Sequence, residues 1–260
     1  MIATSADGVP IAYTVVGAGP PLVLLHGFTE TGASWQEAGY VDRFLRVRRQ
    51  VVLIDCRGHG GSGKPHEAAS YGGDKRARDV VAVLDALGIG AADLIGFSMG
   101  GLIALATALR FPERVRRLVV IGAHPFAQDM APYRLAVAEG IEGWLALLHG
   151  QDVPLTRNTR QRLLANDVRA LQACIAHDRP DKAAALAVLQ APLLAIAGTR
   201  DPIIAGVRDF AERVDGHFLP LEGRNHVTTF LAVGEIVTAV ERFLVDEAAP
   251  AAAIAKANAE

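Results

Sequence analysis

The sequence contains very few cysteines and no long apolar segment. Cys56 and Cys174 are the only cysteines among 260 residues, too few for a disulfide framework, so we expect both thiols to stay reduced. No apolar stretch approaches the roughly 20 residues that a helix needs to cross a bilayer. Residues 1–7 lack a basic segment followed by an apolar run, so no secretory signal is predicted. These absences predict a soluble, cytoplasmic protein.

The sequence also has no large excess of either positive or negative charge. The 26 lysines and arginines nearly balance the 28 aspartates and glutamates, which leaves a formal net charge of -2. A strong positive excess is typical of proteins that bind nucleic acid or an anionic membrane, so neither partner is predicted. The histidines and cysteines lack the close spacing of metal ligands, so we expect neither a metal nor another cofactor.

Short apolar runs alternate with amphipathic segments along the chain. The runs with the length expected of strands buried on both faces are Leu22–Leu25, Val51–Ile54, Asp93–Ile95, Leu118–Ile121 and Leu193–Ile196. The amphipathic segments predict helices over 72–87, 99–110, 204–214 and 232–246. Residues 2–5 and 9–16 predict a hairpin, and 216–221 a last strand. This alternation predicts an α/β protein with a mostly parallel central sheet and helices on both faces.

One long stretch interrupts the alternation. Between His124 and Pro180 no strand pattern occurs, only helix-like segments over 139–148, 157–165 and 167–176. We therefore predict an α/β core formed by 1–123 and 181–247, with 124–180 inserted as a small helical cap. The alanine-rich residues 248–260 predict a disordered tail.

The segment Gly96–Gly100, with the sequence Gly-Phe-Ser-Met-Gly, carries the strongest chemical signal. A strand pattern leads into it and a helix pattern follows it. In that context a G-x-S-x-G motif forms a sharp, strained turn that exposes the serine hydroxyl above the sheet. The following helix also directs free N–H groups and its positive dipole end towards the reaction centre. We therefore predict that Ser98 is a nucleophile.

A serine nucleophile needs a base, and the base needs an acidic partner. His226 follows the last predicted strand, and Asp201 follows the strand over 193–196. Both therefore lie at the carboxyl edge of the sheet, together with Ser98. Asp209 and Asp215 are the competing aspartates, but the pattern puts them on or after a helix. We expect His226 to act as the base and Asp201 to orient it.

The order Ser98, Asp201, His226 resembles that of the α/β-hydrolase fold superfamily, in particular its serine esterase and lactonase branch. The resemblance covers roughly residues 10–245. The segments that carry it are His26-Gly27-Phe28, Asp55-Cys56-Arg57-Gly58-His59-Gly60, Gly96–Gly100, Gly198–Asp201 and Asn225-His226. The resemblance implies an oxyanion hole formed by the backbone N–H groups of Phe28 and Met99.

The resemblance further implies a serine hydrolase that cleaves a small or medium carboxylic ester, lactone or thioester through an acyl-enzyme. Alternatives within the same fold are a perhydrolase or haloperoxidase-like enzyme, a lyase, and a ligand receptor with little turnover. A C–C bond hydrolase is disfavoured because no glycine-rich segment follows His26-Gly27. Epoxide hydrolases and dehalogenases carry aspartate in place of Ser98. Substrate-binding residues are expected to be Phe126, Met130, Trp144 and Val227.

The glycine-rich run Gly58–Pro65 suggests a rival function, nucleotide binding. It follows a strand and reads G-x-x-x-x-G-K before Pro65. A P-loop requires serine or threonine after the lysine to bind Mg²⁺, and proline has neither a hydroxyl nor an N–H group. A dinucleotide fold requires a helix that begins inside the glycine run, which the pattern does not predict. We therefore expect an ordinary loop.

Overall fold

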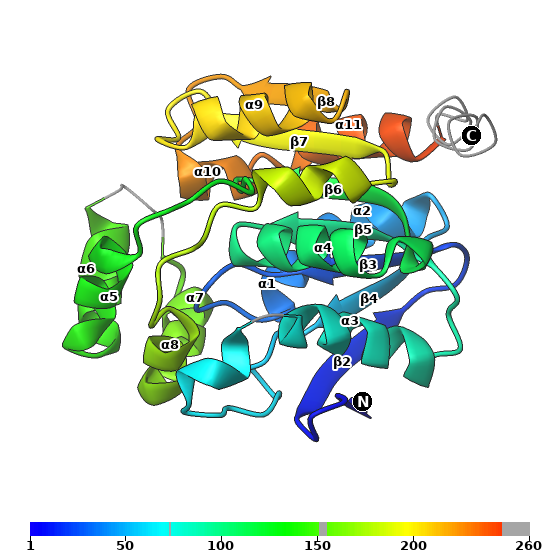
Figure 1. Ribbon diagram of the computed structural model, residues 1–260. Helices are drawn as coiled ribbons and strands as arrows, with labels where there is room; N and C mark the ends of the chain where they lie inside the picture. Colours follow the sequence, from blue (N-terminus) through cyan, green and yellow to red (C-terminus); the bar gives the residue numbers. More distant parts are fainter. Residues whose placement is uncertain (73, 151–154, 246–260) are drawn as a thin grey trace.

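The computed structural model describes residues 1–72, 74–150 and 155–245 (Figure 1). The strands within these residues are β1 (Ile2–Thr4), β2 (Pro10–Val16), β3 (Pro21–Leu25), β4 (Gln50–Ile54), β5 (Ala92–Phe97), β6 (Val115–Ile121), β7 (Leu193–Gly198) and β8 (His217–Leu221). They form one sheet in the order β1-β2-β4-β3-β5-β6-β7-β8. β2 runs antiparallel to β1 and β4, and all other neighbouring strands are parallel. The predicted hairpin and parallel sheet are confirmed.

Helices connect and cover these strands. The α-helices are α1 (Ala33–Glu37), α2 (Tyr40–Arg46), α3 (Lys75–Ala86), α4 (Met99–Arg110), α5 (Ala131–Ala138), α6 (Ile141–His149), α7 (Arg157–Leu164), α8 (Val168–Cys174), α9 (Ile204–Arg213), α10 (His226–Phe230) and α11 (Val233–Val245). Short 3₁₀ helices span η1 (Ala68–Tyr71), η2 (Pro112–Arg114) and η3 (Ala183–Val188).

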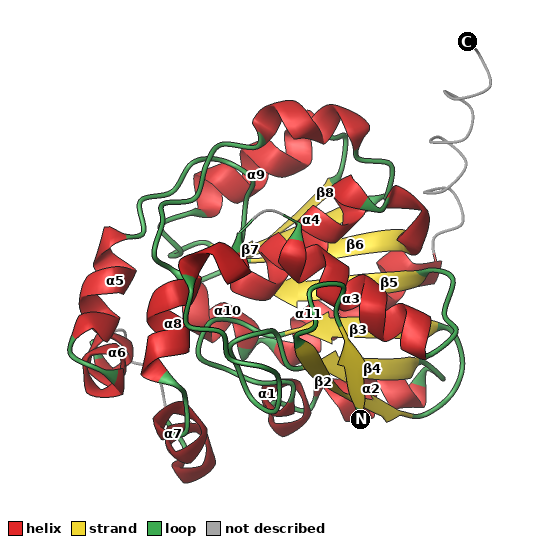
Figure 2. Cartoon of the chain, turned by 60° about the horizontal axis from the view of Figure 1, so that its bottom comes forward, coloured by secondary structure: helices red, strands yellow, loops and turns green. Residues whose placement is uncertain are grey.

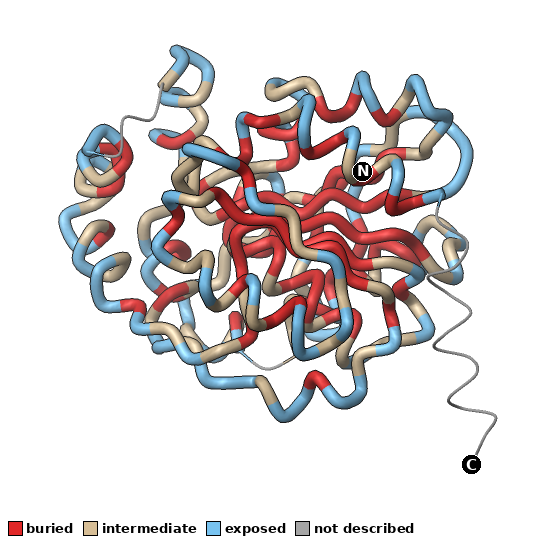
Figure 3. The backbone as a smooth tube through the Cα atoms, turned by 90° about the horizontal axis from the view of Figure 1, so that it is seen from above, coloured by how far each residue is buried: buried red, intermediate tan, exposed pale blue. Residues whose placement is uncertain are grey.

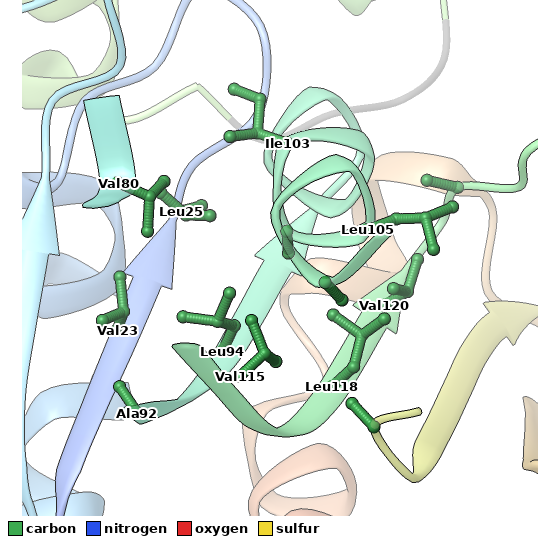
Figure 4. Close-up of a cluster of buried hydrophobic side chains, with 14 of the residues drawn as sticks. Val23, Leu25, Val80, Ala92, Leu94, Ile103, Leu105, Val115, Leu118 and Val120 are labelled. Carbon is green, nitrogen blue, oxygen red and sulfur yellow. The ribbon is translucent and has the colours of Figure 1, made fainter. Parts of the chain in front are cut away.

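Two apolar layers hold the helices against the sheet. On one face, side chains of α3, α4 and α9 pack on the strands, and Val80 of α3 lies beside Leu25 of β3 (Figure 4). On the other face, α1, α2 and α11 contribute Trp35, Phe44 and other apolar side chains. The strands β3 to β7, in the middle of the sheet, are buried along most of their length (Figure 3). Burial on both faces explains why these strands have continuous apolar sequences instead of alternating ones.

The helices α5 to α8 lie together beyond one end of the sheet, the end at which β6 leads into the segment before α5 (Figures 1 and 2). They come from residues 124–180, the stretch in which no strand was predicted, and bury apolar side chains of their own. An isolated bridge joins Gln128 and Arg179 where this excursion begins and ends. The predicted tail, 248–260, lies outside the described residues.

The sequence pattern did not reveal α1, α5 and α10. Helices α1 and α10 have only five residues each, too short for a periodic apolar face. α5 carries Pro132 in its first turn, and its Leu135 is 76% exposed, so its apolar residues do not follow the usual periodicity. Within the described residues, no helix is both long and apolar enough to cross a bilayer, and no cluster of three or more potential metal ligands occurs.

Candidate active site

Ser98 lies at the junction of β5 and α4, in a backbone conformation that side-chain-bearing residues rarely adopt. Its φ and ψ are 52° and -113°. The turn needs glycine two residues before and two residues after Ser98, because neither position has room for a side chain. A Cβ atom on Gly96 would collide with the carbonyl of Gly100, and one on Gly100 with the carbonyl of Leu25. The strained turn presents the hydroxyl at the edge of the sheet.

His226 connects Ser98 to Asp201 through hydrogen bonds. Its Nε2 lies 3.0 Å from Ser98 Oγ, and its Nδ1 lies 2.7 Å from Asp201 Oδ2. Because a carboxylate only accepts hydrogen bonds, Nδ1 carries the proton and donates to Asp201. Nε2 is then free to accept the proton of the serine hydroxyl. This is the arrangement that base-activated nucleophilic catalysis requires.

Local structure fixes the orientation of both partners. Asp201 is 2% exposed and follows β7, and its second carboxylate oxygen accepts from the N–H of Ile203. His226 is the first residue of α10, where Asn225 and Thr228 form a capping box that defines the start of the helix. The imidazole packs against the ring of Phe97, with ring centroids 5.2 Å apart.

The competing aspartates have other surroundings. Asp209 lies on α9, and both of its carboxylate oxygens accept from Nε of Arg213 at 3.0 Å. Asp215 follows α9 in a left-handed backbone conformation. Asp201 is the aspartate that is hydrogen-bonded to His226.

The two N–H groups predicted as oxyanion donors belong to the backbone of Phe28 and Met99. Among the described residues, the backbone N–H groups of Phe28 and Met99 have no acceptor. Met99 is the first residue of α4, where such N–H groups have no partner within the helix. Both groups are therefore available to a substrate oxygen.

The loop that carries Phe28 is held from two sides. On the core side, the buried His26 accepts from the N–H of Cys56 at Nε2 and bonds the carbonyl of Gly27 through Nδ1. On the other side, Asn166 donates to the carbonyl of Thr29. The adjacent Glu30 forms an ion pair with Arg162 of α7 at 2.7 Å.

His26 and His59 make stability depend on pH. Burial lowers the pKa of His26 to about 4 and that of His59 to about 3. Both stay neutral in the folded protein, whereas the unfolded chain takes up protons below its histidine pKa of about 6.5. Stability therefore falls as the pH drops from 6.5 towards 4. We expect these residues to lower the free energy of unfolding by about 4 kcal/mol between pH 7 and pH 5, measured by urea denaturation.

His59→Gln tests this expectation because glutamine does not titrate. About half of the predicted pH dependence should disappear in this variant. His177→Gln, which removes an exposed histidine, is the matched control and should retain it. An unchanged pH dependence in His59→Gln would contradict the argument.

A cavity of about 1140 Å³ opens in front of Ser98 and His226. Of the predicted substrate-binding residues, Met130, Trp144 and Val227 line it, as does Phe28. The rings of Phe28 and Trp144 meet edge to face, with centroids 5.1 Å apart. The wall next to the serine is therefore largely apolar.

Phe126 does not belong to this wall, contrary to expectation. Its ring lies 4.9 Å from the guanidinium of Arg213 and 5.4 Å from the ring of His124. Packing against the core and α9 turns it away from the cavity. Met99 is also absent from the lining, since its side chain is buried against the Cys174 thiol. The role predicted for Met99 concerns its backbone only.

The glycine-rich loop after β4 lacks the features of a phosphate site. In a phosphate-binding loop, successive backbone N–H groups point at the ligand. Here the N–H groups that already donate to acceptors inside the protein are those of Gly58, His59, Gly61, Ser62 and Gly63. These N–H groups are therefore bonded within the protein instead of pointing at a ligand. This agrees with the expectation of an ordinary loop, which was based on Pro65.

Sequence reasoning missed polar residues in the cavity wall. Four of them come from the excursion between β6 and β7, namely Arg162, Arg179, Gln128 and Tyr133. No local pattern marks them because their positions depend on how the helices of the excursion pack. Arg162 forms ion pairs with Glu30 and also with Glu37.

Comparisons with known proteins agree with this architecture. A sequence profile of the α/β hydrolase fold matches residues 20–185. The chain is 40% identical over 118 residues to a 2-hydroxy-6-oxo-2,4-heptadienoate hydrolase of Pseudomonas putida, an alignment that covers 45% of this chain and 42% of the relative. It is 46% identical over 107 residues to a 2-hydroxymuconate semialdehyde hydrolase of Pseudomonas sp., covering 41% and 38%. The chain thus spans less than half the length of these curated relatives.

Solved structures match over nearly the whole chain. A hydrolase from Pseudomonas aeruginosa is 26% identical with a TM-score of 0.77, covering 94% of this chain and 98% of that one. An esterase from Rhodococcus sp. is 25% identical with a TM-score of 0.77, covering 95% and 98%. An enol-lactonase from Burkholderia xenovorans shares the fold with a TM-score of 0.81 at 23% identity, covering 95% and 100%. From its profile match and its architecture, the chain belongs to the α/β-hydrolase fold family.

Proposed function

We propose that the protein is a serine hydrolase that cleaves small or medium carboxylic esters, lactones or thioesters through an acyl-enzyme. The observation that carries the proposal is the position of His226, whose two ring nitrogens lie 3.0 Å from Ser98 Oγ and 2.7 Å from Asp201 Oδ2. A buried carboxylate, an oriented imidazole and a strained serine that lines the cavity provide the groups that acyl transfer requires.

In the first half of the reaction, Ser98 Oγ attacks the substrate carbonyl carbon while His226 Nε2 takes the hydroxyl proton. Asp201 stabilises the imidazolium that forms and holds its Nδ1 proton. The N–H groups of Phe28 and Met99 donate to the developing oxyanion, each worth about 3 kcal/mol. The imidazolium then returns the proton to the leaving group, and the acyl group stays on the serine.

In the second half, a water molecule replaces the leaving group. His226 removes a proton from this water, which attacks the acyl carbon, and the proton passes to Ser98 as the acid departs. The cavity volume of about 1140 Å³ is of the order found for small-molecule sites and fits a small or medium substrate. We also propose that residues 124–180 act as the cap over this site.

Labelling combined with turnover tests the proposal. A fluorophosphonate reacts with an activated serine, so we expect one mass shift that maps to Ser98. Activity should fall in proportion to the fraction of protein that is labelled. The untreated protein should turn over many equivalents of 4-nitrophenyl butyrate. Labelling without repeated turnover would favour a ligand receptor. An unlabelled Ser98 would contradict the proposal. A panel of esters, lactones and thioesters of graded chain length then defines the substrate.

A second candidate substrate class comes from the two curated relatives. They are named for the hydrolysis of 2-hydroxy-6-oxo-2,4-heptadienoate and 2-hydroxymuconate semialdehyde. The same three residues are available for that chemistry. The two classes are distinguished by their kcat/KM values. The value for these two compounds, measured from the loss of their absorbance, is compared with the value for 4-nitrophenyl butyrate. A hundredfold preference for either class decides between them.

A further inference from the structure

Arg179 occupies a fixed position in the wall of the cavity that contains Ser98 and His226. Its backbone forms a two-way bridge with Gln128: each N–H donates to the carbonyl of the other residue at 3.0 Å. Its Nη1 also donates to Gln128 Oε1 at 2.6 Å. The guanidinium is therefore held in place before any ligand binds.

Arg179 lacks the negative partner that a half-buried guanidinium usually has. Among the described residues, no carboxylate lies within ion-pair distance of it. Asp178, next in the chain, binds Arg134 at 2.8 Å and the N–H of Met130. Asp181 accepts from the N–H of Ala183. The carboxylates near Arg179 in the sequence are thus engaged elsewhere.

The electrostatic surroundings of Arg179 are unfavourable for a positive charge. Burial and the charge of Arg76 lower its pKa to about 10, and the acidic groups that act on it are the Tyr133 hydroxyl and the Cys174 thiol. Neither of these groups is a carboxylate, and burial raises the pKa of the Cys174 thiol, so the thiol supplies no negative charge, whereas Arg179 remains charged. A partly buried cation without an anion is unfavourable in the free protein, and a bound anion would relieve that penalty.

The other arginines of the cavity wall differ in this respect. Arg162 is bound by Glu30 and Glu37, Arg224 lies 3.6 Å from Glu235, and Arg200 is exposed to solvent. Among the described residues that line the cavity, Arg179 is the arginine that is half-buried and without a carboxylate.

The chemical groups around Arg179 are suited to a carboxylate. Its remaining guanidinium nitrogens have no acceptor within residues 1–72, 74–150 and 155–245, and they stay accessible. Because Gln128 Oε1 is occupied by Arg179, the Gln128 Nε2 group is left as a further donor. A planar guanidinium with an adjacent amide donor matches the two oxygens of a carboxylate, and its single positive charge matches one negative charge.

We propose that Arg179 and Gln128 form a carboxylate-binding subsite, so that the substrate carries a carboxylate in addition to its scissile acyl group. This inference rests on the proposed hydrolase function and narrows its substrate class. A site built to bind a charged group discriminates against the uncharged analogue because its own polar groups are left unpaired.

Matched pairs of substrates test the subsite. One pair carries the carboxylate on the acyl side, 4-nitrophenyl hydrogen glutarate against its methyl ester. The other carries it on the alcohol side, 4-(butyryloxy)benzoate against its methyl ester. We expect kcat/KM for the charged member of at least one pair to exceed that of the neutral member by about tenfold to a hundredfold. Equal values in both pairs would overturn the proposal.

Arg179→Gln should abolish this preference, because it should lower kcat/KM for the charged esters by about tenfold to a hundredfold more than for the neutral esters. Gln128→Leu should weaken the preference by a smaller factor. Arg169→Gln removes an exposed arginine from α8 and is the matched control, so it should retain the preference. Equal losses for charged and neutral esters in a folded Arg179→Gln protein would overturn the subsite.

Binding separates failure of the subsite from failure of the proposed function. If no ester is cleaved, the proposed function fails, and titration calorimetry of glutarate with Ser98→Ala tests the subsite alone. Glutarate should bind Ser98→Ala at least tenfold more tightly than Ser98→Ala/Arg179→Gln, as judged for proteins with unchanged circular dichroism. Equal affinity, or no binding to Ser98→Ala, would overturn the subsite.

Discussion

Replacing Ser98 with alanine should lower kcat/KM for 4-nitrophenyl butyrate by about 10⁴-fold to 10⁶-fold. In the proposed mechanism the substitution removes the oxygen that forms the acyl-enzyme, while the cavity and the proposed oxyanion donors Phe28 and Met99 remain. A small residual rate is therefore expected from binding and oxyanion stabilisation alone. The measurement is steady-state release of 4-nitrophenolate, with circular dichroism and thermal unfolding of the same samples.

The control for this variant is Ser70→Ala, which removes a hydroxyl that is not part of the cavity lining. It should retain activity close to that of the wild type. Fluorophosphonate labelling should persist in Ser70→Ala and disappear in Ser98→Ala. An unchanged rate in Ser98→Ala would remove Ser98 as the nucleophile.

Asp201→Asn should lower kcat by about 10⁴-fold with little change in the fold. An asparagine that donates its amide N–H to His226 Nδ1 forces the ring proton onto Nε2, where it faces Ser98. The imidazole then has no lone pair with which to accept the serine proton. Because the side chains have the same size, substrate binding should change little, so the effect should appear in kcat more than in KM.

Asp209→Asn and Asp215→Asn are the matched controls. Asp209 forms a surface ion pair with Arg213, both side chains being about half exposed, so its loss should have little effect on rate or stability. If either control lost activity while Asp201→Asn kept it, the assignment of the acidic partner would be wrong.

The sequence was sufficient to bring Ser98, Asp201 and His226 together. Each lies in the segment that follows a strand of the sheet, within five residues of the strand's end, and the carboxyl ends of parallel strands meet at one edge. The local patterns of apolar runs therefore determine which loops are neighbours. The loop of Phe28 follows β3 and lies at the same edge, but the role of Phe28 was predicted from the resemblance to the α/β-hydrolase fold and not from the strand pattern.

The wall of the cavity was less predictable. Trp144 and Met130 were recognised as apolar candidates, but Phe126 was placed there as well, although it packs beside Arg213. No sequence pattern marked Arg179 as a residue of the cavity wall. The helices between β6 and β7 have no hydrogen-bonded register with the sheet, so which of their side chains face the serine depends on tertiary packing alone.

The contacts between α7 and the loop of Phe28 have a consequence for protein engineering. Arg162 and Asn166 of the excursion bind Glu30 and the carbonyl of Thr29, next to the oxyanion donor. A graft that exchanges the stretch between β6 and β7 to alter selectivity therefore also replaces the clamp on that donor. In the proposed mechanism selectivity and turnover are therefore coupled, and a successful graft has to carry both polar side chains with it.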